Sequence, residues 1–220
     1  MNSAQARRRG PGTPPRPAAL TLSAADPDWP RRAVAALRRS PARAGGVRVL
    51  AVEGRSGAGK TTLARRLAAE AGCPLLHMDD LYPGWSGLAA AVPLVRQWVL
   101  EPLARGADPR WRPYDWARGA FGDWQTTPVR GELVVEGCGS GAAELRPHLA
   151  ALAWVEAPRE ERERRLDARW DAAEYAPYRH MWADQEDAFY AAHHPREHAD
   201  LVIDNGGPAP AGGAGRGAAD

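Results

Sequence analysis

The feature that most constrains this chain is residues 54–61, which read Gly-Arg-Ser-Gly-Ala-Gly-Lys-Thr and fit the pattern G-x-x-x-x-G-K-[ST] of a phosphate-binding loop. Residues 47–53 form an apolar run typical of a buried strand, and residues 62–70 are good helix formers. A glycine-rich turn that matches by chance is the alternative. Because strand, loop and helix follow in the required order, we favour a true phosphate-binding loop.

This loop predicts a nucleotide site with a magnesium ion. The glycines let successive backbone N–H groups point inward, where the start of the following helix adds positive potential. Lys60, the only lysine in the sequence, is expected to reach the β- and γ-phosphates, and the Thr61 hydroxyl to ligate Mg²⁺. The predicted nucleotide-binding residues are Gly54, Arg55, Ser56, Gly57, Ala58, Gly59, Lys60, Thr61 and Thr62.

Composition favours one soluble, cytoplasmic domain. The chain of 220 residues has a net charge of +2, two cysteines and no apolar run long enough to span a membrane. Residues 1–45 hold nine arginines against Asp26 and Asp28, so the remainder is about five units negative. A mildly acidic body argues against specific nucleic-acid binding, although the basic arm could contact polyanions weakly.

Five short apolar runs predict the fold. They are residues 47–53, 74–79, 132–136, 151–156 and 200–204, each ending in a carboxylate, and helical stretches alternate with them. This pattern is typical of a three-layer α/β sandwich with a five-stranded parallel sheet, whose ligands gather at the carboxyl ends of the strands. We expect a disordered basic arm over residues 1–25, a domain over 26–205 and a disordered tail over 206–220.

Carboxylates at two strand ends are candidates for the chemistry. Asp79 and Asp80 follow the second run, and strand alternation favours Asp79 as the residue that faces the phosphate loop and acts as a base. The alternative is that Asp80, or both, only caps the next segment. Glu136 ends the third run, where it is expected to orient Mg²⁺ through water.

A charge-dense helix over residues 160–169 is expected to form a lid. Arg162, Arg165 and Arg169 share one face of it and could stabilise charge on a transferring phosphoryl group. The alternative is a solvated helix with pairs such as Glu161 to Arg165. Substrate identity is expected to lie in the long insert at residues 81–131, where Trp85 and Trp116 could stack on a flat ligand or simply belong to the core.

Together these segments resemble the uridine kinase group of P-loop kinases, over roughly residues 47–205. The family's D-x-F-Y signature corresponds to residues 79–82, its P-x-Y-D-F signature to residues 113–116, and its strand-end glutamate to Glu136. The resemblance implies a five-stranded P-loop NTPase fold with a helical lid, use of ATP and Mg²⁺, Asp79 as the base, and Arg165 and Arg169 as lid arginines. The histidine that the family places soon after Tyr-Asp has no counterpart around Gly119.

The sequence therefore predicts an ATP-dependent phosphotransferase that moves the γ-phosphoryl group to a hydroxyl of a nucleoside-like or other small-molecule acceptor. The predicted catalytic residues are Lys60, Asp79, Arg165 and Arg169, and the predicted acceptor contacts are Asp80, Tyr82, Arg112, Tyr114 and Asp115. A nucleotide-binding switch or assembly NTPase without an acceptor is the main alternative. A polyanion-binding protein that works through its arm is a third, and GTP in place of ATP stays open.

Overall fold

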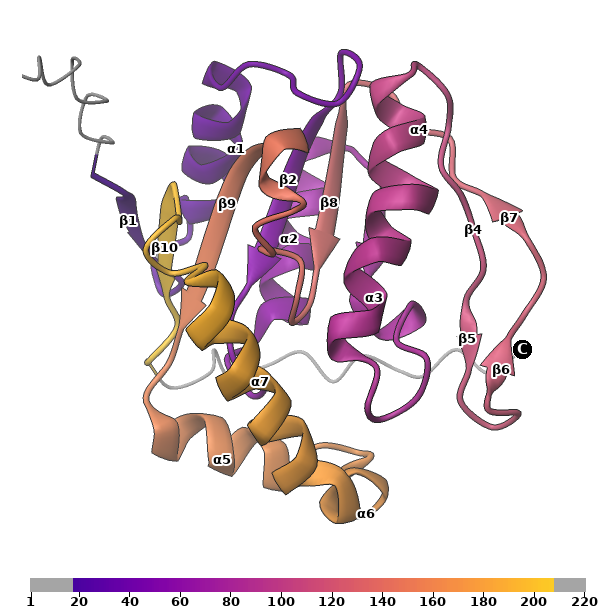
Figure 1. Ribbon diagram of the computed structural model, residues 1–220. Coiled ribbons are helices and arrows are strands. Elements are labelled where there is room, and N and C mark those ends of the chain that lie inside the picture. The colour runs from indigo at the N-terminus through magenta and orange to yellow at the C-terminus, as the bar shows by residue number, and fades with distance from the viewer. Residues whose placement is uncertain (1–17, 208–220) are drawn as a thin grey trace, which may run out of the picture.

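The computed structural model describes residues 18–207, which form a central parallel sheet between two layers of helices (Figure 1). The strands of this sheet lie in the order β1-β10-β9-β2-β8-β3, and each neighbouring pair is parallel. Their bounds are β1 Leu20–Ser23, β2 Arg48–Glu53, β3 Leu75–His77, β8 Glu132–Glu136, β9 Leu149–Glu156 and β10 Leu201–Asp204. The α/β sandwich predicted from the sequence is confirmed.

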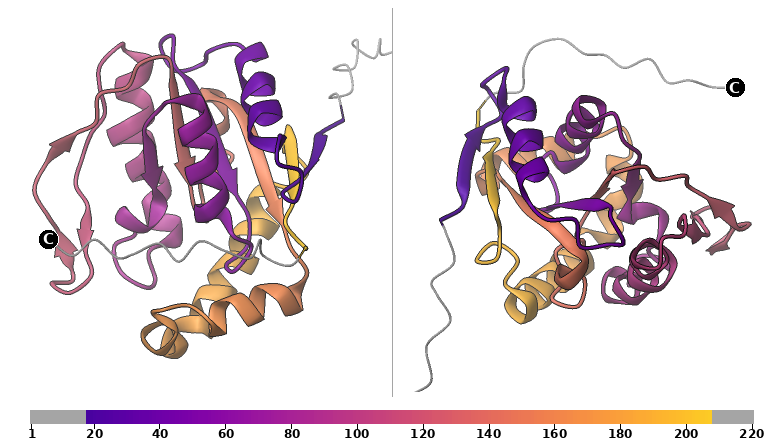
Figure 2. Two further views of the ribbon diagram at one scale, coloured as in Figure 1. Left: turned by 180° about the vertical axis from the view of Figure 1, so that it is seen from behind. Right: turned by 90° about the horizontal axis from the view of Figure 1, so that it is seen from above.

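Side-chain alternation along the strands divides the core into two halves. In β2, Leu50 and Val52 pack toward α1 (Trp29–Arg39) and α2 (Lys60–Ala71), whereas Val49 and Ala51 pack toward the opposite face. That face is covered by α3 (Leu88–Val95), the π-helical turn η2 (Arg96–Leu100), α4 (Glu101–Ala104) and α7 (Arg179–His193), while Figure 2 shows α1 and α2 together on the other side. Both sheet faces are therefore buried, as parallel strands require.

The sheet has six strands instead of the five that we predicted. Leu20–Ser23 form β1, which pairs in parallel with β10, although these residues fall inside the segment expected to be a disordered arm. The run is short and buries only Leu22, so it lacks the continuous apolar pattern by which the other strands were found. Residues 1–17 and 208–220, the remainder of the predicted arm and most of the predicted tail, lie outside the described residues.

Two segments extend from the sheet near the carboxyl ends of its strands. After β9 come α5 (Arg159–Asp167), α6 (Ala172–Tyr175) and the short helix η4 (Ala176–Tyr178), which lie below the strand ends in Figure 1 and lead into α7. Between β3 and β8 the insert forms α3 to α4 and then two small antiparallel ribbons. These ribbons pair β4 (Arg110–Trp111) with β7 (Gln125–Thr126) and β5 (Tyr114–Asp115) with β6 (Ala120–Phe121).

The remaining short helices are η1 (Met78–Asp80), directly after β3, and η3 (Arg146–His148), directly before β9. None of the helices in the described part of the chain is long and apolar enough to cross a membrane.

Candidate active site

The loop between β2 and α2 has the backbone that its glycines predict. Gly54, Gly57 and Gly59 adopt φ angles of 150°, 78° and 93°, which side-chain-bearing residues rarely adopt. Space is a second constraint, because a Cβ atom at Gly54 would lie 2.5 Å from the Val155 carbonyl oxygen and one at Gly57 would collide with the Arg162 carbonyl. The glycines are therefore needed both for the turn itself and for close packing against β9 and α5.

Lys60 lies inside this loop. Its Nζ donates hydrogen bonds to the carbonyl oxygens of Gly54 at 2.7 Å and Arg55 at 3.2 Å, and it contacts Cys138 Sγ at 3.4 Å. Burial alone would lower the pKa of Lys60, but the electrostatic effects of Cys138 and of nearby carboxylates, Glu186 first among them, outweigh it and hold this pKa above its usual value. The ammonium is therefore a fixed positive charge at the centre of the loop.

The residues predicted to hold Mg²⁺ lie together. Glu136 Oε1, at the end of β8, accepts hydrogen bonds from Thr61 Oγ1 at 3.1 Å and from His77 Nδ1 at 2.6 Å. Among residues 18–207 no group of three or more His, Cys, Asp or Glu side chains could hold a metal ion by itself. One hydroxyl and one carboxylate nevertheless fit Mg²⁺, which typically takes one or two protein ligands and completes its octahedron with phosphate oxygens and water.

Asp79 has the environment of a base without a partner. Its carboxylate makes no hydrogen bond or ion pair with another described residue, and its side chain is open to solvent. Although solvent reaches this side chain, the protein atoms around it displace part of its hydration, and this, together with the charge of Glu136, raises the pKa of Asp79 to about 6. Lys60 and Arg169 act in the opposite direction, so Asp79 lies within electrostatic range of both.

Asp80 differs from Asp79 in its neighbours. Loss of hydration on burial also raises the pKa of Asp80, and the charges that act on it are those of His77 and Glu136, without Lys60 or Arg169. The backbone carbonyl of Asp79 accepts a hydrogen bond from Trp116 Nε1 at 3.2 Å, which fixes η1 against the insert. These differences support the prediction that Asp79, and not Asp80, faces the phosphate loop.

The two predicted lid arginines occupy different places. Arg165 donates to the carbonyl oxygens of Ala58 at 3.1 Å and Asn205 at 2.8 Å, so its guanidinium clamps α5 onto the loop and the end of β10. Arg169 is held by both carboxylate oxygens of Asp171 and lies 5.1 Å over the ring of Tyr175. Because the charge of Arg169 acts on Asp79, we keep only Arg169 as a candidate to contact a transferring group.

Two of the predicted acceptor contacts, Tyr82 and Arg112, make hydrogen bonds within the protein. Tyr82 is 2 % exposed and donates its hydroxyl hydrogen to the Cys138 carbonyl at 2.7 Å, so it belongs to the core. Arg112 donates to the carbonyl oxygens of Gly122 and Phe121 at 2.6 and 3.0 Å, which uses its guanidinium to close the ribbon of its own insert.

Tyr114 and Asp115 remain half-buried beside η1, where the ribbon of β5 contacts residues 78–80. Asp115 Oδ1 accepts a hydrogen bond from the backbone N–H of Arg118 at 3.0 Å, so this carboxylate also shapes the turn that follows it. Both positions stay candidates for acceptor binding.

Aromatic side chains join the insert to the lid next to Asp79. Trp85 stacks on Tyr178 with ring centroids 4.4 Å apart and an interplanar angle of 9°, and its other neighbours are Trp116 at 4.8 Å and Tyr175 at 5.9 Å. Trp116 is 40 % exposed. Trp85 therefore packs within the aromatic cluster, as a structural role predicts. Trp116 keeps part of its ring exposed, where it could stack on a flat ligand.

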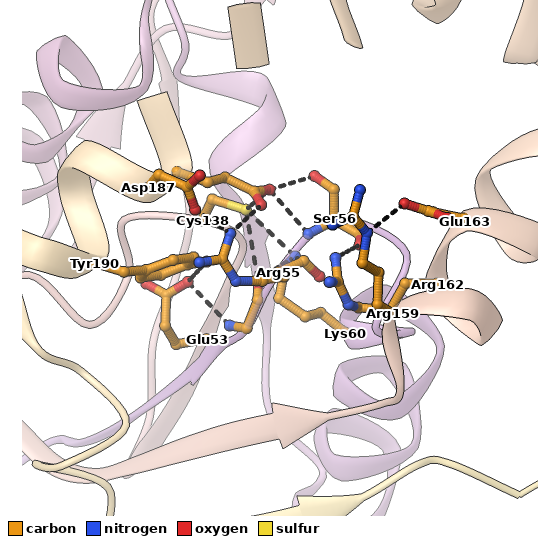
Figure 3. Close-up of polar contacts among 12 residues, drawn as sticks. Glu53, Arg55, Ser56, Lys60, Cys138, Arg159, Arg162, Glu163, Asp187 and Tyr190 are labelled. Carbon is orange, nitrogen blue, oxygen red and sulfur yellow. Dashed lines mark hydrogen bonds and ion pairs between the residues drawn. The ribbon is translucent and has the colours of Figure 1, made fainter. Parts of the chain in front are cut away.

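Sequence reasoning missed several groups that hold the loop in place (Figure 3). Glu53 is fully buried, and its carboxylate accepts hydrogen bonds from three backbone N–H groups and from the Tyr190 hydroxyl. Glu186 Oε1 accepts from Ser56 N at 2.8 Å and from Ser56 Oγ at 2.5 Å. A charged residue at the end of an apolar strand could have drawn attention to Glu53, whereas no local pattern points to Glu186.

Comparisons with known proteins agree with this fold. No family model matches the chain, and no curated protein matches it. Among solved structures, it is similar to a possible uridine kinase from Bacillus stearothermophilus at 23% identity, covering 72% of this chain and 89% of that one with a TM-score of 0.51. It is also similar to a candidate fructose transport system kinase from Silicibacter sp. TM1040 at 20% identity, covering 79% and 97% with a TM-score of 0.50.

At these identities the likeness establishes the fold, which is that of P-loop kinases. The activity has to be argued from the site itself.

Proposed function

We propose that this protein is an ATP-dependent kinase that transfers the γ-phosphoryl group to a hydroxyl of a small-molecule acceptor. The observation that carries the proposal is the unpaired, solvent-open carboxylate of Asp79, which lies within the field of Lys60 at the phosphate loop. A protein that only bound or hydrolysed nucleotide would not need a free carboxylate beside this loop.

Each residue has a role that its geometry supports. The N–H groups of the loop and the Lys60 ammonium bind the phosphates and fix their orientation, and Arg169 offsets charge that spreads onto the transferring group. Asp79 accepts the proton of the acceptor hydroxyl, which its pKa of about 6 suits near neutral pH. Mg²⁺, held by Thr61 and, through water, by Glu136, would neutralise phosphate charge when bound.

The acceptor side is bounded by residues with both polar and aromatic character. Asp80, Tyr114 and Asp115 offer hydrogen-bond partners, and the open face of Trp116 offers a surface for stacking. This combination supports a nucleoside-like alcohol or another small molecule with a flat or apolar part. Adenine or guanine could occupy the nucleotide site, since the sequence contains no base-reading motif that we can identify.

The test is release of ADP or GDP from purified protein incubated with Mg-ATP or Mg-GTP against a panel of nucleosides, vitamins and sugars. We expect release that depends on one class of acceptor and is lost in Lys60→Ala. Nucleotide hydrolysis at the same rate with and without every acceptor would instead favour the switch or assembly NTPase.

A further inference from the structure

A cavity of about 330 Å³ lies beside the phosphate loop, where the end of β9 meets α5 and α7. Its volume falls at the lower end of the range typical of small-molecule sites. The residues that line it are Arg55, Trp154, Val155, Glu156, Ala157, Arg162, Tyr190 and Arg196. Neither Lys60 nor Asp79 lines it, whereas Arg55 of the phosphate loop and Arg162 of α5 do.

The charges on the wall favour an anion. Three guanidinium groups line the cavity against the single carboxylate of Glu156. Arg55, although part of the phosphate loop, extends toward α7, where it pairs with Asp187 at 2.6 Å and with Glu186 at 3.8 Å and lies 5.0 Å over the ring of Tyr190 (Figure 3). Within residues 18–207, Arg162 donates one long hydrogen bond, to the Ser56 carbonyl at 3.3 Å, and its other N–H groups have no partner there.

The third guanidinium is held by a carboxylate that a ligand could replace. Arg196 donates to both oxygens of Glu156 at 3.2 and 3.0 Å, and the two side chains are 59 % and 45 % exposed. Ion pairs as exposed as this one are weak, because water screens the charges and ordering two long side chains costs entropy. An incoming anion can therefore compete for Arg196 with little loss to the fold.

We propose that this cavity binds a small organic dianion, which is a phosphate monoester or a dicarboxylate. Guanidinium forks on Arg55, Arg162 and Arg196 match the paired oxygens of either group. The rings of Trp154 and Tyr190 provide a surface for the organic part of the ligand, and the volume exceeds what inorganic phosphate alone would fill. The ligand binds on the outer side of the phosphate loop, at the same time as the nucleotide.

Calorimetric titrations test this site with glycerol 3-phosphate and with succinate, one probe for each kind of dianion. Both are run at constant ionic strength and with saturating Mg-ADP, so that the phosphate loop is filled. Arg196→Gln and Glu156→Gln form a matched pair, because each breaks the same exposed ion pair but only the first removes a ligand contact. The comparison between them does not depend on whether the protein is a kinase.

We expect wild-type protein to bind at least one probe, Arg196→Gln to weaken its binding about tenfold or more, and Glu156→Gln to strengthen it. Binding of glycerol 3-phosphate alone identifies a phosphate monoester as the ligand class, and binding of succinate alone a dicarboxylate. The proposal is overturned if neither probe binds, if both variants shift the dissociation constant in the same direction or not at all, or if Mg-ADP abolishes binding.

Discussion

The hydroxyl of Tyr190 in α7 donates a hydrogen bond to Glu53 Oε1 at 3.1 Å, which joins the helix behind the lid to the strand that carries the phosphate loop. The same oxygen accepts from Gly54 N at 3.0 Å, and Oε2 accepts from Gly139 N at 2.8 Å and Gly141 N at 2.9 Å. One buried carboxylate thus fixes the loop, the turn after β8 and α7 relative to one another.

We therefore predict that Glu53→Gln destabilises the protein. A carboxamide of the same shape places its own N–H₂ group against N–H or O–H donors, and an unsatisfied buried group costs about 1 to 3 kcal/mol. Urea unfolding measures the loss. Tyr190→Phe is the control, since it removes one donor of the four and should cost less. Equal stability of Glu53→Gln and wild type would show that the carboxylate does not organise these segments.

Replacement of Lys60 should remove activity even when positive charge is kept. The ammonium fits between the Gly54 carbonyl and Cys138 Sγ, at 2.7 and 3.4 Å, a space too narrow for a planar guanidinium. We expect Lys60→Ala and Lys60→Arg each to lower kcat by about 10² or more. Single-turnover transfer from radiolabelled ATP measures this. Turnover in Lys60→Arg close to that of wild type would contradict the steric argument.

The two neighbouring aspartates should differ sharply in kinetics. Asp79→Asn keeps the shape of the side chain but cannot accept a proton, so kcat should fall by about 10² to 10⁴ with little change in nucleotide affinity. Asp80→Asn should lower kcat much less, because Lys60 and Arg169 are not among the charges that shift the pKa of Asp80. Steady-state kinetics with equilibrium nucleotide binding separates the two effects. The reverse ranking would assign the base to Asp80.

Activity should fall on the acid side at a higher pH than an ordinary aspartate would give. Asp79 must be ionised to accept a proton, and its pKa is raised from 3.8 to about 6. Above this pH the Asp79 carboxylate is ionised and can accept the proton. Below it, kcat/KM should drop about tenfold for each pH unit. A profile of kcat/KM between pH 4.5 and 8 measures this fall in activity on the acid side. Its persistence in the residual activity of Asp79→Asn would mean that another group titrates.

Uridine and cytidine should be poor acceptors. The segment at residues 116–120 is exposed and holds no imidazole to bind the ring of a pyrimidine, and each ring polar group left unpaired costs about 1 to 3 kcal/mol. Another alcohol in the panel should give a higher kcat/KM. A value for uridine of about 10⁴ M⁻¹s⁻¹ or above, the usual range for enzymes, would contradict this and point to Arg118 or a tryptophan of the insert.

The parts that sequence predicted well are those in which local pattern determines local structure. The phosphate loop follows from its glycines, whose φ angles few other residues adopt. Apolar runs gave the buried strands because parallel strands are covered on both faces. The short run of β1, with only Leu22 buried, gave no such signal.

Side-chain direction and long-range contacts could not be predicted from the sequence. The sequence signature identifies Tyr82 but does not show which way its side chain points. In the structure the ring packs into the core, where its hydroxyl donates a hydrogen bond to the Cys138 carbonyl. Glu186 contacts Ser56 across 130 positions of the chain. No spacing rule predicts such a pair, because it depends on how α7 crosses the sheet after the lid.

The pairing of β1 with β10 also determines how far the chain can be shortened. With β1 in place, the edge of the sheet is a strand of four residues whose buried side chain is Leu22, which is 2 % exposed. A chain that began at residue 26 would lose the backbone hydrogen bonds between β1 and β10 and the packing of Leu22 in the core. Truncations that test whether the basic arm binds polyanions should therefore end before residue 18, so that loss of binding is not confused with loss of stability.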